Sequence, residues 1–381
     1  MIYRDINGTR LSAIGMGCMR LPVVGGCDGF IDEEQVRQMV DYALSHGVNY
    51  FDTAWGYHAG RSETVMSSCL RRHPREHYCL ATKFPGYNVD NFARKEEIFK
   101  EQLERTGVDH FDFYLLHNVI ELNIEHYLDA GRDGLVPYLL RQKELGRIDH
   151  LGFSCHGELE TLKRLMDVWG DQMEFCQIQL NYQDWRFQRA DRKVAWLVGQ
   201  GVPIIAMEPL RGGHLAVFTA QEQARLDALR PGVSPVEWGY RYVQSTPGVA
   251  VVLSGMSDLA QCRQNVAVFQ TDDPLTAEER RVLEDIAEAR LADSVVPCTG
   301  CRYCLDQCPS DLDIPYLISL YNEFMSRDDE KWLSMLKLDA LPEEELPAMC
   351  LGCKSCTKVC PQGIDVAGVL DDFIDRLSKM G

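Results

Sequence analysis

Short apolar runs rich in β-formers alternate with stretches of helical periodicity over about the first 290 residues. This alternation is typical of parallel strands joined by crossover helices. The run at 2–14 differs, because Asn7-Gly8 separates two strand-like segments and predicts a β-hairpin. Eight strand candidates follow, at 14–16, 48–52, 78–83, 111–117, 150–154, 175–180, 203–208 and 249–254. Eight such units predict an α/β fold, a (β/α)8 TIM barrel with an N-terminal β-hairpin, whose active site lies at the C-terminal strand ends.

The helical stretches between these runs carry their own boundary signals. In IDEEQVRQMVDYALSHG, Asp32 is placed to cap the first turn and Gly47 to end the last one. An open, doubly wound sheet is the structural alternative to a barrel. Its dinucleotide fingerprint G-x-G-x-x-G is not completed by the GMGCMR that follows the first strand candidate, which favours the barrel.

Two copies of one cysteine pattern lie near the C-terminus, Cys298-x2-Cys301-x2-Cys304-x3-Cys308-Pro309 and Cys350-x2-Cys353-x2-Cys356-x3-Cys360-Pro361. Four cysteines in such a short run before a proline are typical of iron–sulfur sites, in which the fourth cysteine ligates the other cluster. Zinc, the rival, usually takes two well-separated ligand pairs. We therefore predict two 4Fe-4S clusters, one held by Cys298, Cys301, Cys304 and Cys360, the other by Cys350, Cys353, Cys356 and Cys308.

About forty residues of mostly helical spacing separate the two cysteine runs, far more than in compact bacterial ferredoxins. Residues 291–381 resemble the α-helical ferredoxin module of succinate dehydrogenase iron–sulfur subunits and heterodisulfide reductase subunits. The sequence thus predicts two domains, a barrel over 1–290 and an α-helical ferredoxin-like domain over 291–381.

Charge and targeting signals narrow the function classes. With 57 Asp and Glu against 39 Lys and Arg, the formal charge of -18 argues against nucleic-acid or anionic-membrane partners. An acidic surface suits docking of a basic redox partner. The N-terminus lacks a signal-peptide pattern, and no apolar run is long enough to cross a bilayer. The 15 cysteines therefore indicate metal or redox ligands in a reducing compartment, and we expect a cytoplasmic protein.

Four chemically distinct side chains fall at or just after predicted strand ends, Asp52, Tyr57, Lys83 and His117. The C-terminal ends of barrel strands meet at one mouth, so these groups are expected to meet there. An ammonium beside a phenol favours phenolate and lowers the phenol pKa, while a buried carboxylate keeps the cation in place. Such a phenol can protonate an alkoxide as hydride reaches the carbonyl carbon, with a neutral imidazole polarising the same oxygen.

The segments around these residues resemble the aldo-keto reductase superfamily from the hairpin to about residue 290. They are GVNYFDTAWGY with GRSE, ATK, DFYLLH, GRIDHLGFS, QLNYQ, EPLRGG and SGMSDLAQCRQN. The resemblance implies that Tyr57 is the general acid, Lys83 its activator, Asp52 the partner of the lysine and His117 the group that orients the carbonyl. With the cysteine runs, the chain resembles the ferredoxin-bearing branch of that superfamily, common in anaerobic bacteria and archaea.

The same resemblance implies an extended nicotinamide cofactor, NAD or NADP, but only part of the family's contact set is present. Ser154 and Gln179 match the carboxamide-binding residues, and Met207 takes the place of the usual stacking aromatic. Gly255 and Gln261 stand where members that clamp the adenosine 2'-phosphate have Lys and Arg, which puts NADP selectivity in doubt. Ser257 and Asn265 are expected as adenosine-site contacts, or else as a helix cap and an exposed polar residue.

Electron counting leaves the role of the clusters open, because clusters pass single electrons whereas hydride transfer moves two. A flavin such as FMN is the usual converter, and no motif identifies a flavin site. The leading hypothesis is an iron–sulfur oxidoreductase that interconverts a carbonyl and an alcohol on a small metabolite. The alternatives are a flavin- or ferredoxin-coupled reductase with the clusters as relay, and a non-catalytic electron-transfer or scaffold subunit. Clusters that only stabilise the domain are equally compatible with the sequence.

Overall fold

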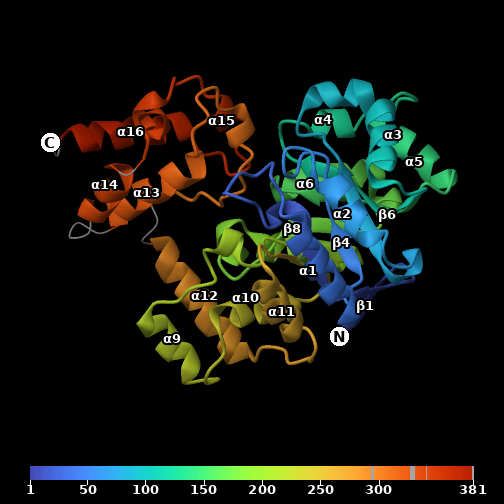
Figure 1. The fold of residues 1–381 in the computed structure, drawn as a ribbon, viewed down its shortest axis with the longest axis horizontal. Coiled ribbons are helices and arrows are strands. Elements are labelled where there is room, and N and C mark those ends of the chain that lie inside the picture. Colours follow the sequence, from blue (N-terminus) through green and yellow to red (C-terminus); the bar gives the residue numbers. More distant parts are fainter. Residues whose placement is uncertain (293–295, 327–330, 340, 380–381) are drawn as a thin grey trace. The chain divides into compact units, whose positions relative to one another are not determined.

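The computed structural model of the chain describes residues 1–292, 296–326, 331–339 and 341–379. Its internal contacts divide the chain into two compact units, Met1–Leu283 and Glu284–Gly381 (Figure 1). We refer to them as the barrel unit and the C-terminal unit. The division falls within helix α12 (Ala277–Ala292), close to the expected boundary at residue 290, which stays a prediction.

The barrel unit begins with an antiparallel hairpin and continues into a closed parallel barrel. The hairpin strands are β1 (Tyr3–Ile6) and β2 (Thr9–Ser12). The barrel strands are β3 (Ile14–Gly17), β4 (Tyr50–Asp52), β5 (Cys79–Phe84), β6 (Phe111–Val119), β7 (Ile148–Cys155), β8 (Cys176–Gln179), β9 (Ile204–Met207) and β10 (Val249–Gly255). Each strand pairs with the next in parallel, and β10 closes the barrel against β3. The predicted TIM barrel with its N-terminal hairpin is confirmed, and the open doubly wound sheet is excluded.

Helices connect the barrel strands. They are α1 (Glu33–Ser45), α2 (Ser62–Leu70), α3 (Lys95–Thr106), α4 (Ile124–Tyr127), α5 (Leu135–Glu144), α6 (Leu159–Trp169), α7 (Asp184–Phe187), α8 (Ala190–Gly199), α9 (Ala220–Asp227), α10 (Pro235–Gln244) and α11 (Leu259–Val268), followed by α12. The capping prediction for α1 is confirmed, because the Asp32 carboxylate accepts a hydrogen bond from the Gln35 backbone amide. Gly47 follows the helix with φ of +90°, a conformation that favours glycine.

The barrel interior is filled by apolar side chains from most of its strands. Ile6 and Leu11 of the hairpin join this core, where they pack with residues such as Tyr50, Phe113 and Phe175. Every one of these side chains is fully buried. The hairpin therefore seals the interior, and the interior is a packed core rather than a pore.

The C-terminal unit is built from short helices around its own apolar core. Its helices are α13 (Ile314–Ser326), α14 (Lys331–Asp339), α15 (Ser355–Lys358) and α16 (Val366–Ser378). The core includes Leu317, Tyr321, Leu370 and Phe373, and several of the cysteines pack against it. The helical character expected between the cysteine runs is confirmed for the described residues. Within the described residues of the whole chain, no helix is both long enough and apolar enough to cross a membrane.

Candidate functional site

A buried ion pair lies at the C-terminal ends of β4 and β5. The Lys83 ammonium donates to Asp52 Oδ1 at 2.6 Å and to the Thr53 carbonyl oxygen at 2.7 Å. The Lys83 side chain is 0% exposed and that of Asp52 is 3% exposed. Burial raises the pKa of Asp52, and the lysine opposes this shift. The lysine is therefore held in one place, because its charge has a partner that solvent cannot replace.

Tyr57 lies in the loop after β4, and its ring is adjacent to the Lys83–Asp52 pair. The Lys83 Nζ atom lies 4.9 Å from the centre of the Tyr57 ring. Burial raises the pKa of the Tyr57 phenol well above its ordinary value, and the Asp52 carboxylate adds to that shift. The direction is opposite to the lowering expected from the lysine alone, since Asp52 screens the lysine charge and the pocket desolvates the phenolate. At neutral pH the phenol is therefore protonated.

His117 of β6 faces the same mouth. Its ring centre lies 5.9 Å from that of Tyr57, in an edge-to-face arrangement. Burial and the neighbouring charge of Lys83 hold the pKa of His117 well below its ordinary value. The imidazole is therefore neutral at physiological pH, as the sequence led us to expect. The structure thus brings Asp52, Tyr57, Lys83 and His117 together.

A network behind the mouth fixes the loop of Tyr57 relative to the strand of Lys83. The buried Glu63 of α2 accepts hydrogen bonds from Thr82 Oγ1 at 2.6 Å and from Gln102 Nε2 at 2.8 Å. Gln102 Nε2 also lies 3.0 Å from the Lys83 carbonyl oxygen. Because the GRSE motif begins α2 directly after the tyrosine loop, one carboxylate ties this loop to β5. The motif was recognisable as a family match, but this network was not predictable from the sequence, since its partners are far apart along the chain.

Two predicted cofactor contacts, Ser154 and Gln179, are buried at the ends of β7 and β8. Ser154 Oγ accepts a hydrogen bond from the Asn118 backbone amide at 2.8 Å, and Gln179 Nε2 donates to Asp184 Oδ2 at 2.8 Å. Asn118 was not predicted, although it directly follows His117. It has φ of +56°, and its buried Oδ1 atom has no hydrogen-bond partner among the described residues. That acceptor suits an amide donor from a bound ligand.

Met207 and its neighbours form the opposite part of the mouth. The Met207 sulfur accepts from Gln177 Nε2 at 3.6 Å. The next residue, Glu208, pairs with Arg20 at 3.1 Å. A side chain at Gly255 would meet the Arg20 side chain at 3.3 Å, so the arginine lies over that glycine. Arg20 is a second residue that the sequence did not reveal, because it follows β3 and reaches β9 and β10 only in the folded barrel.

Ser257 and Asn265 are not brought together by the structure. Ser257 is exposed and donates to the Arg20 carbonyl oxygen at 3.0 Å. Asn265 is buried in α11, where its amide donates to Tyr240 Oη and Ser254 Oγ, both at 3.0 Å. The alternative of a cap and an exposed polar residue is wrong, because Asp258 caps α11 and Asn265 is buried rather than exposed.

Two further residues near the mouth have structural surroundings. The His58 ring accepts a hydrogen bond from the Leu21 backbone amide at 3.0 Å and lies 2.9 Å from the Asp28 carbonyl oxygen. These two contacts connect the loop after β4 to the segment that contains Leu21 and Asp28. Cys155 is buried, and burial raises the pKa of its thiol to about 11. The thiol is therefore protonated and a poor nucleophile at neutral pH.

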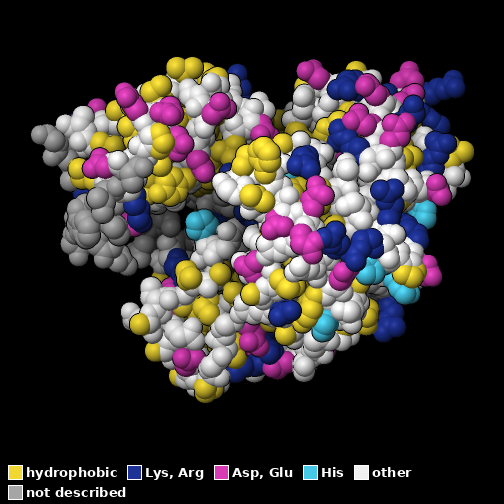
Figure 2. Space-filling view, viewed as in Figure 1, with side chains coloured by type: hydrophobic (Ala, Val, Ile, Leu, Met, Phe, Trp, Pro, Cys, Tyr) yellow, Lys and Arg dark blue, Asp and Glu magenta, His cyan; other side chains and the backbone are white. Residues whose placement is uncertain are grey.

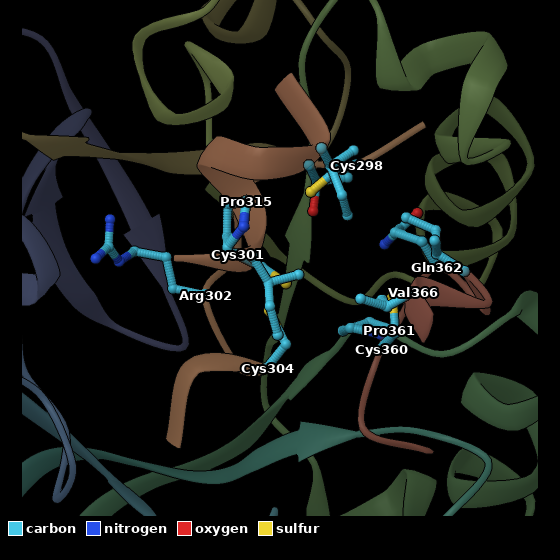
Figure 3. Close-up of a pocket in the computed structure, with 13 residues that line it drawn as sticks. Cys298, Cys301, Arg302, Cys304, Pro315, Cys360, Pro361, Gln362 and Val366 are labelled. Carbon is cyan, nitrogen blue, oxygen red and sulfur yellow. The ribbon is translucent and has the colours of Figure 1, made fainter. Parts of the chain in front are cut away.

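The eight predicted cluster ligands line two separate pockets of the C-terminal unit. One pocket is lined by Cys298, Cys301, Cys304 and Cys360, as Figure 3 shows, with the Arg302 side chain directed away from the four cysteines. The other is lined by Cys308, Cys350, Cys353 and Cys356. Each pocket thus contains three cysteines of one run and the fourth of the other. Four cysteine sulfurs at one pocket fit the ligand set of an iron–sulfur cubane.

The chain matches two families along its length. Residues 13–288 match the aldo/keto reductase family, and residues 297–364 match a 4Fe-4S dicluster domain. The chain therefore belongs to the aldo/keto reductase family. It is an oxidoreductase of that type with a 4Fe-4S domain at its C-terminal end.

Individual relatives agree with this assignment. The uncharacterized oxidoreductase YqkF of Bacillus subtilis is 24% identical over 308 residues, which cover 73% of this chain and 95% of the relative. Methylglyoxal reductase DkgA of Salmonella typhimurium is 28% identical over 238 residues, 62% of this chain and 76% of that enzyme. Among solved structures, aldo-keto reductase AKR11C1 from Bacillus halodurans in its holo form has a TM-score of 0.61 at 24% identity, covering 76% of this chain and 97% of that one. The likeness to the solved structure supports the barrel fold.

Proposed function

We propose that this protein interconverts a carbonyl and an alcohol on a small metabolite, with hydride from NAD(P)H and Tyr57 as general acid. The observation that carries the proposal is the buried Lys83–Asp52 pair beneath the Tyr57 ring, with the neutral His117 beside it. The relative named methylglyoxal reductase supports a small carbonyl compound as the substrate class.

The four side chains divide the work of reduction. Bound NAD(P)H supplies hydride to the carbonyl carbon. As the π bond of the carbonyl group breaks, the oxygen gains its electron pair and takes the proton of the Tyr57 phenol. Lys83 stabilises the phenolate that remains, and Asp52 holds Lys83 in place. The raised pKa of Tyr57 keeps its proton in place until the much more basic alkoxide forms.

His117 contributes as a hydrogen-bond donor. A neutral imidazole carries one N–H, and this donor can polarise the carbonyl oxygen without giving up its proton. Burial keeps the ring neutral, so the site does not add another positive charge beside Lys83. Proton transfer is thereby left to Tyr57.

The dinucleotide contacts are assigned to the other side of the mouth. Ser154, Gln179 and the partnerless amide oxygen of Asn118 would bind the carboxamide, and Met207 would cover the ring. Arg20 lies over Gly255 and would supply a cation at the place where other family members use the Lys and Arg that Gly255 and Gln261 replace. Because Arg20 is already paired with Glu208 at 3.1 Å, which offsets its charge, we propose no strong preference for NADP over NAD. Ser257 and Asn265 remain weaker adenosine-site candidates.

The C-terminal unit would hold two 4Fe-4S clusters, which supply one-electron chemistry when bound. Cys298, Cys301, Cys304 and Cys360 would hold one cluster, and Cys308, Cys350, Cys353 and Cys356 the other. A flavin- or ferredoxin-coupled reaction is the alternative, and the incomplete cationic fork at Gly255 and Gln261 is the observation that favours it.

The test is a Tyr57→Phe variant made and assayed without oxygen. We expect turnover to fall by about 10²–10⁴-fold, as for loss of a general acid, with unchanged iron and sulfide content. Tyr87→Phe is the matched control, because Tyr87 also packs edge-to-face on His117 at 5.4 Å. It should retain most of the turnover. Full activity of Tyr57→Phe would refute the assignment, and titration with NADH, NADPH and FMN would identify the organic cofactor.

A further inference from the structure

The two cysteine runs share one spacing but differ in their surroundings. The residue after the first cysteine is Thr299 in the first run, which is 1% exposed, and Leu351 in the second run, which is 71% exposed. Met349, which precedes the second run, is 42% exposed. Cys353, at the centre of that run, is itself exposed. A large apolar side chain therefore lies at the surface directly beside a ligand of the second site, whereas the corresponding residue of the first site is buried.

Packing against the described residues of the unit buries less than a third of the Leu351 side chain. It lines the pocket of Cys308, Cys350, Cys353 and Cys356, yet most of its surface is accessible. An exposed leucine beside a redox site can anchor a partner protein, because burial of its apolar surface favours association. We define Met349, Leu351 and Cys353 as the port.

Charge around the port favours a basic partner. Three consecutive glutamates, Glu343 to Glu345, are exposed and lie just before the port in the chain. Their short helix packs on Pro347–Met349. Lys354 and Lys358 are also exposed nearby, and they offset the negative charge that four thiolates bring to the site. From Glu284 onwards the chain has about twice as many acidic as basic side chains, and Figure 2 shows acidic groups spread over its visible face.

We propose that the port is the docking surface for a small redox protein with a basic rim, and that electrons cross there between the partner and the cluster held by Cys308, Cys350, Cys353 and Cys356. In this step one electron leaves the reduced cluster and reduces one oxidised centre of the partner, with no bond made or broken and no proton moved. The inference rests on the proposed clusters and adds which of them exchanges electrons with the outside.

The experiment uses cytochrome c, a basic haem protein, as the probe. The holoprotein is reduced without oxygen, and haem reduction is followed by stopped flow at several ionic strengths. The second-order rate constant should fall as salt rises, which is the sign for opposite charges. A rate constant that rises with salt would overturn the proposed charge match.

Leu351→Asn tests the apolar anchor. We expect the rate constant to fall by about tenfold, as for loss of a moderate interface anchor. Leu145→Asn is the matched control, because Leu145 is 65% exposed in the barrel unit, and it should leave the rate unchanged. Equal rates for the two variants would refute the port. So would a Leu351→Asn effect confined to thermal unfolding or to the oligomeric state, since the leucine would then pack within this chain or against a second copy.

The glutamates are tested by changing Glu343, Glu344 and Glu345 together to Gln. This variant should react more slowly at low salt and show a flatter salt dependence. The same changes at Glu104, Glu125 and Glu160 of the barrel unit, whose side chains are 64–79% exposed, are the control. Iron and sulfide assays, with electron paramagnetic resonance of the reduced protein, distinguish a failure of the proposed clusters from a failure of the proposed port. A protein without clusters would refute the proposed clusters on which the port depends, whereas intact clusters with unaltered rates in both variants would refute the port alone.

Discussion

Removing the ammonium of Lys83 tests whether the pair at the mouth is as isolated from water as its geometry indicates. In Lys83→Met, the Asp52 carboxylate loses a donor at 2.6 Å and is left in a site where its side chain is 3% exposed. Loss of one partner of a buried pair costs about 3–5 kcal/mol. This is a large part of the stability of a typical domain, which is about 5–15 kcal/mol.

The cost should depend on pH, with a sign that the structure fixes. Burial already raises the pKa of Asp52, and Lys83 is the group that opposes the shift, so its removal raises the pKa further. Between the unfolded value of about 4 and the folded pKa, only the folded variant holds the proton. Its unfolding free energy therefore falls as pH rises through that window, by at most about 1.4 kcal/mol per pH unit.

Urea unfolding at pH 5 and pH 8, followed by tryptophan fluorescence, measures the effect. Five of the six tryptophans precede residue 283, so the signal reports mainly on the barrel unit. Lys83→Met should be clearly less stable at pH 8 than at pH 5. The double variant Lys83→Met/Asp52→Leu should recover most of the stability and none of the turnover. A loss below about 1 kcal/mol at pH 8, or one independent of pH, would refute the electrostatic reasoning.

Three further predictions concern other parts of the chain. Because burial and Lys83 hold the pKa of His117 well below its ordinary value, kcat/KM should show no limb from this imidazole near pH 6.5, and a limb there that disappears in His117→Gln would contradict it. Since only the unfolded chain would then protonate this histidine, its contribution to stability should decrease as pH falls below about 6.5. Arg20→Met should weaken dinucleotide binding by about tenfold in fluorescence titrations, and Arg20→Lys should weaken it less, as expected when one charged contact is lost. Cys360→Ser and Cys308→Ser should each remove about half of the bound iron, from opposite clusters, whereas loss of iron from the same cluster in both would exclude crossed ligation.

The fold was predictable because its signals are local. Each barrel strand is a short buried run, and its alternation with helices can be read without knowledge of distant contacts. The cap of α1 needs only Asp32 and the amide three residues on. The cysteine runs are predictable for the same reason, since their spacing lies within single loops.

The site was predictable only in part. Asp52, Lys83 and His117 lie at or near the C-terminal ends of their strands, so the barrel topology alone brings them to one mouth. The direction of the Tyr57 pKa shift was not predictable, because it depends on how completely the folded site excludes water. The position of Arg20 over Gly255 depends on loops more than two hundred residues apart, which only the closed barrel brings together.

The exchange of the fourth cysteine between the two pockets bears on how the C-terminal unit matures. Cys308 lies with the later run and Cys360 with the earlier one, so one set of four sulfurs is complete only when synthesis has passed residue 356 and the other only when it has passed residue 360. Loading of the two proposed clusters would therefore begin only after most of the second cysteine run has been made. A chain cut between the runs would retain three of the four sulfurs of the first site and only Cys308 of the second. Loss of either cluster would loosen the loop that supplies a ligand to the other.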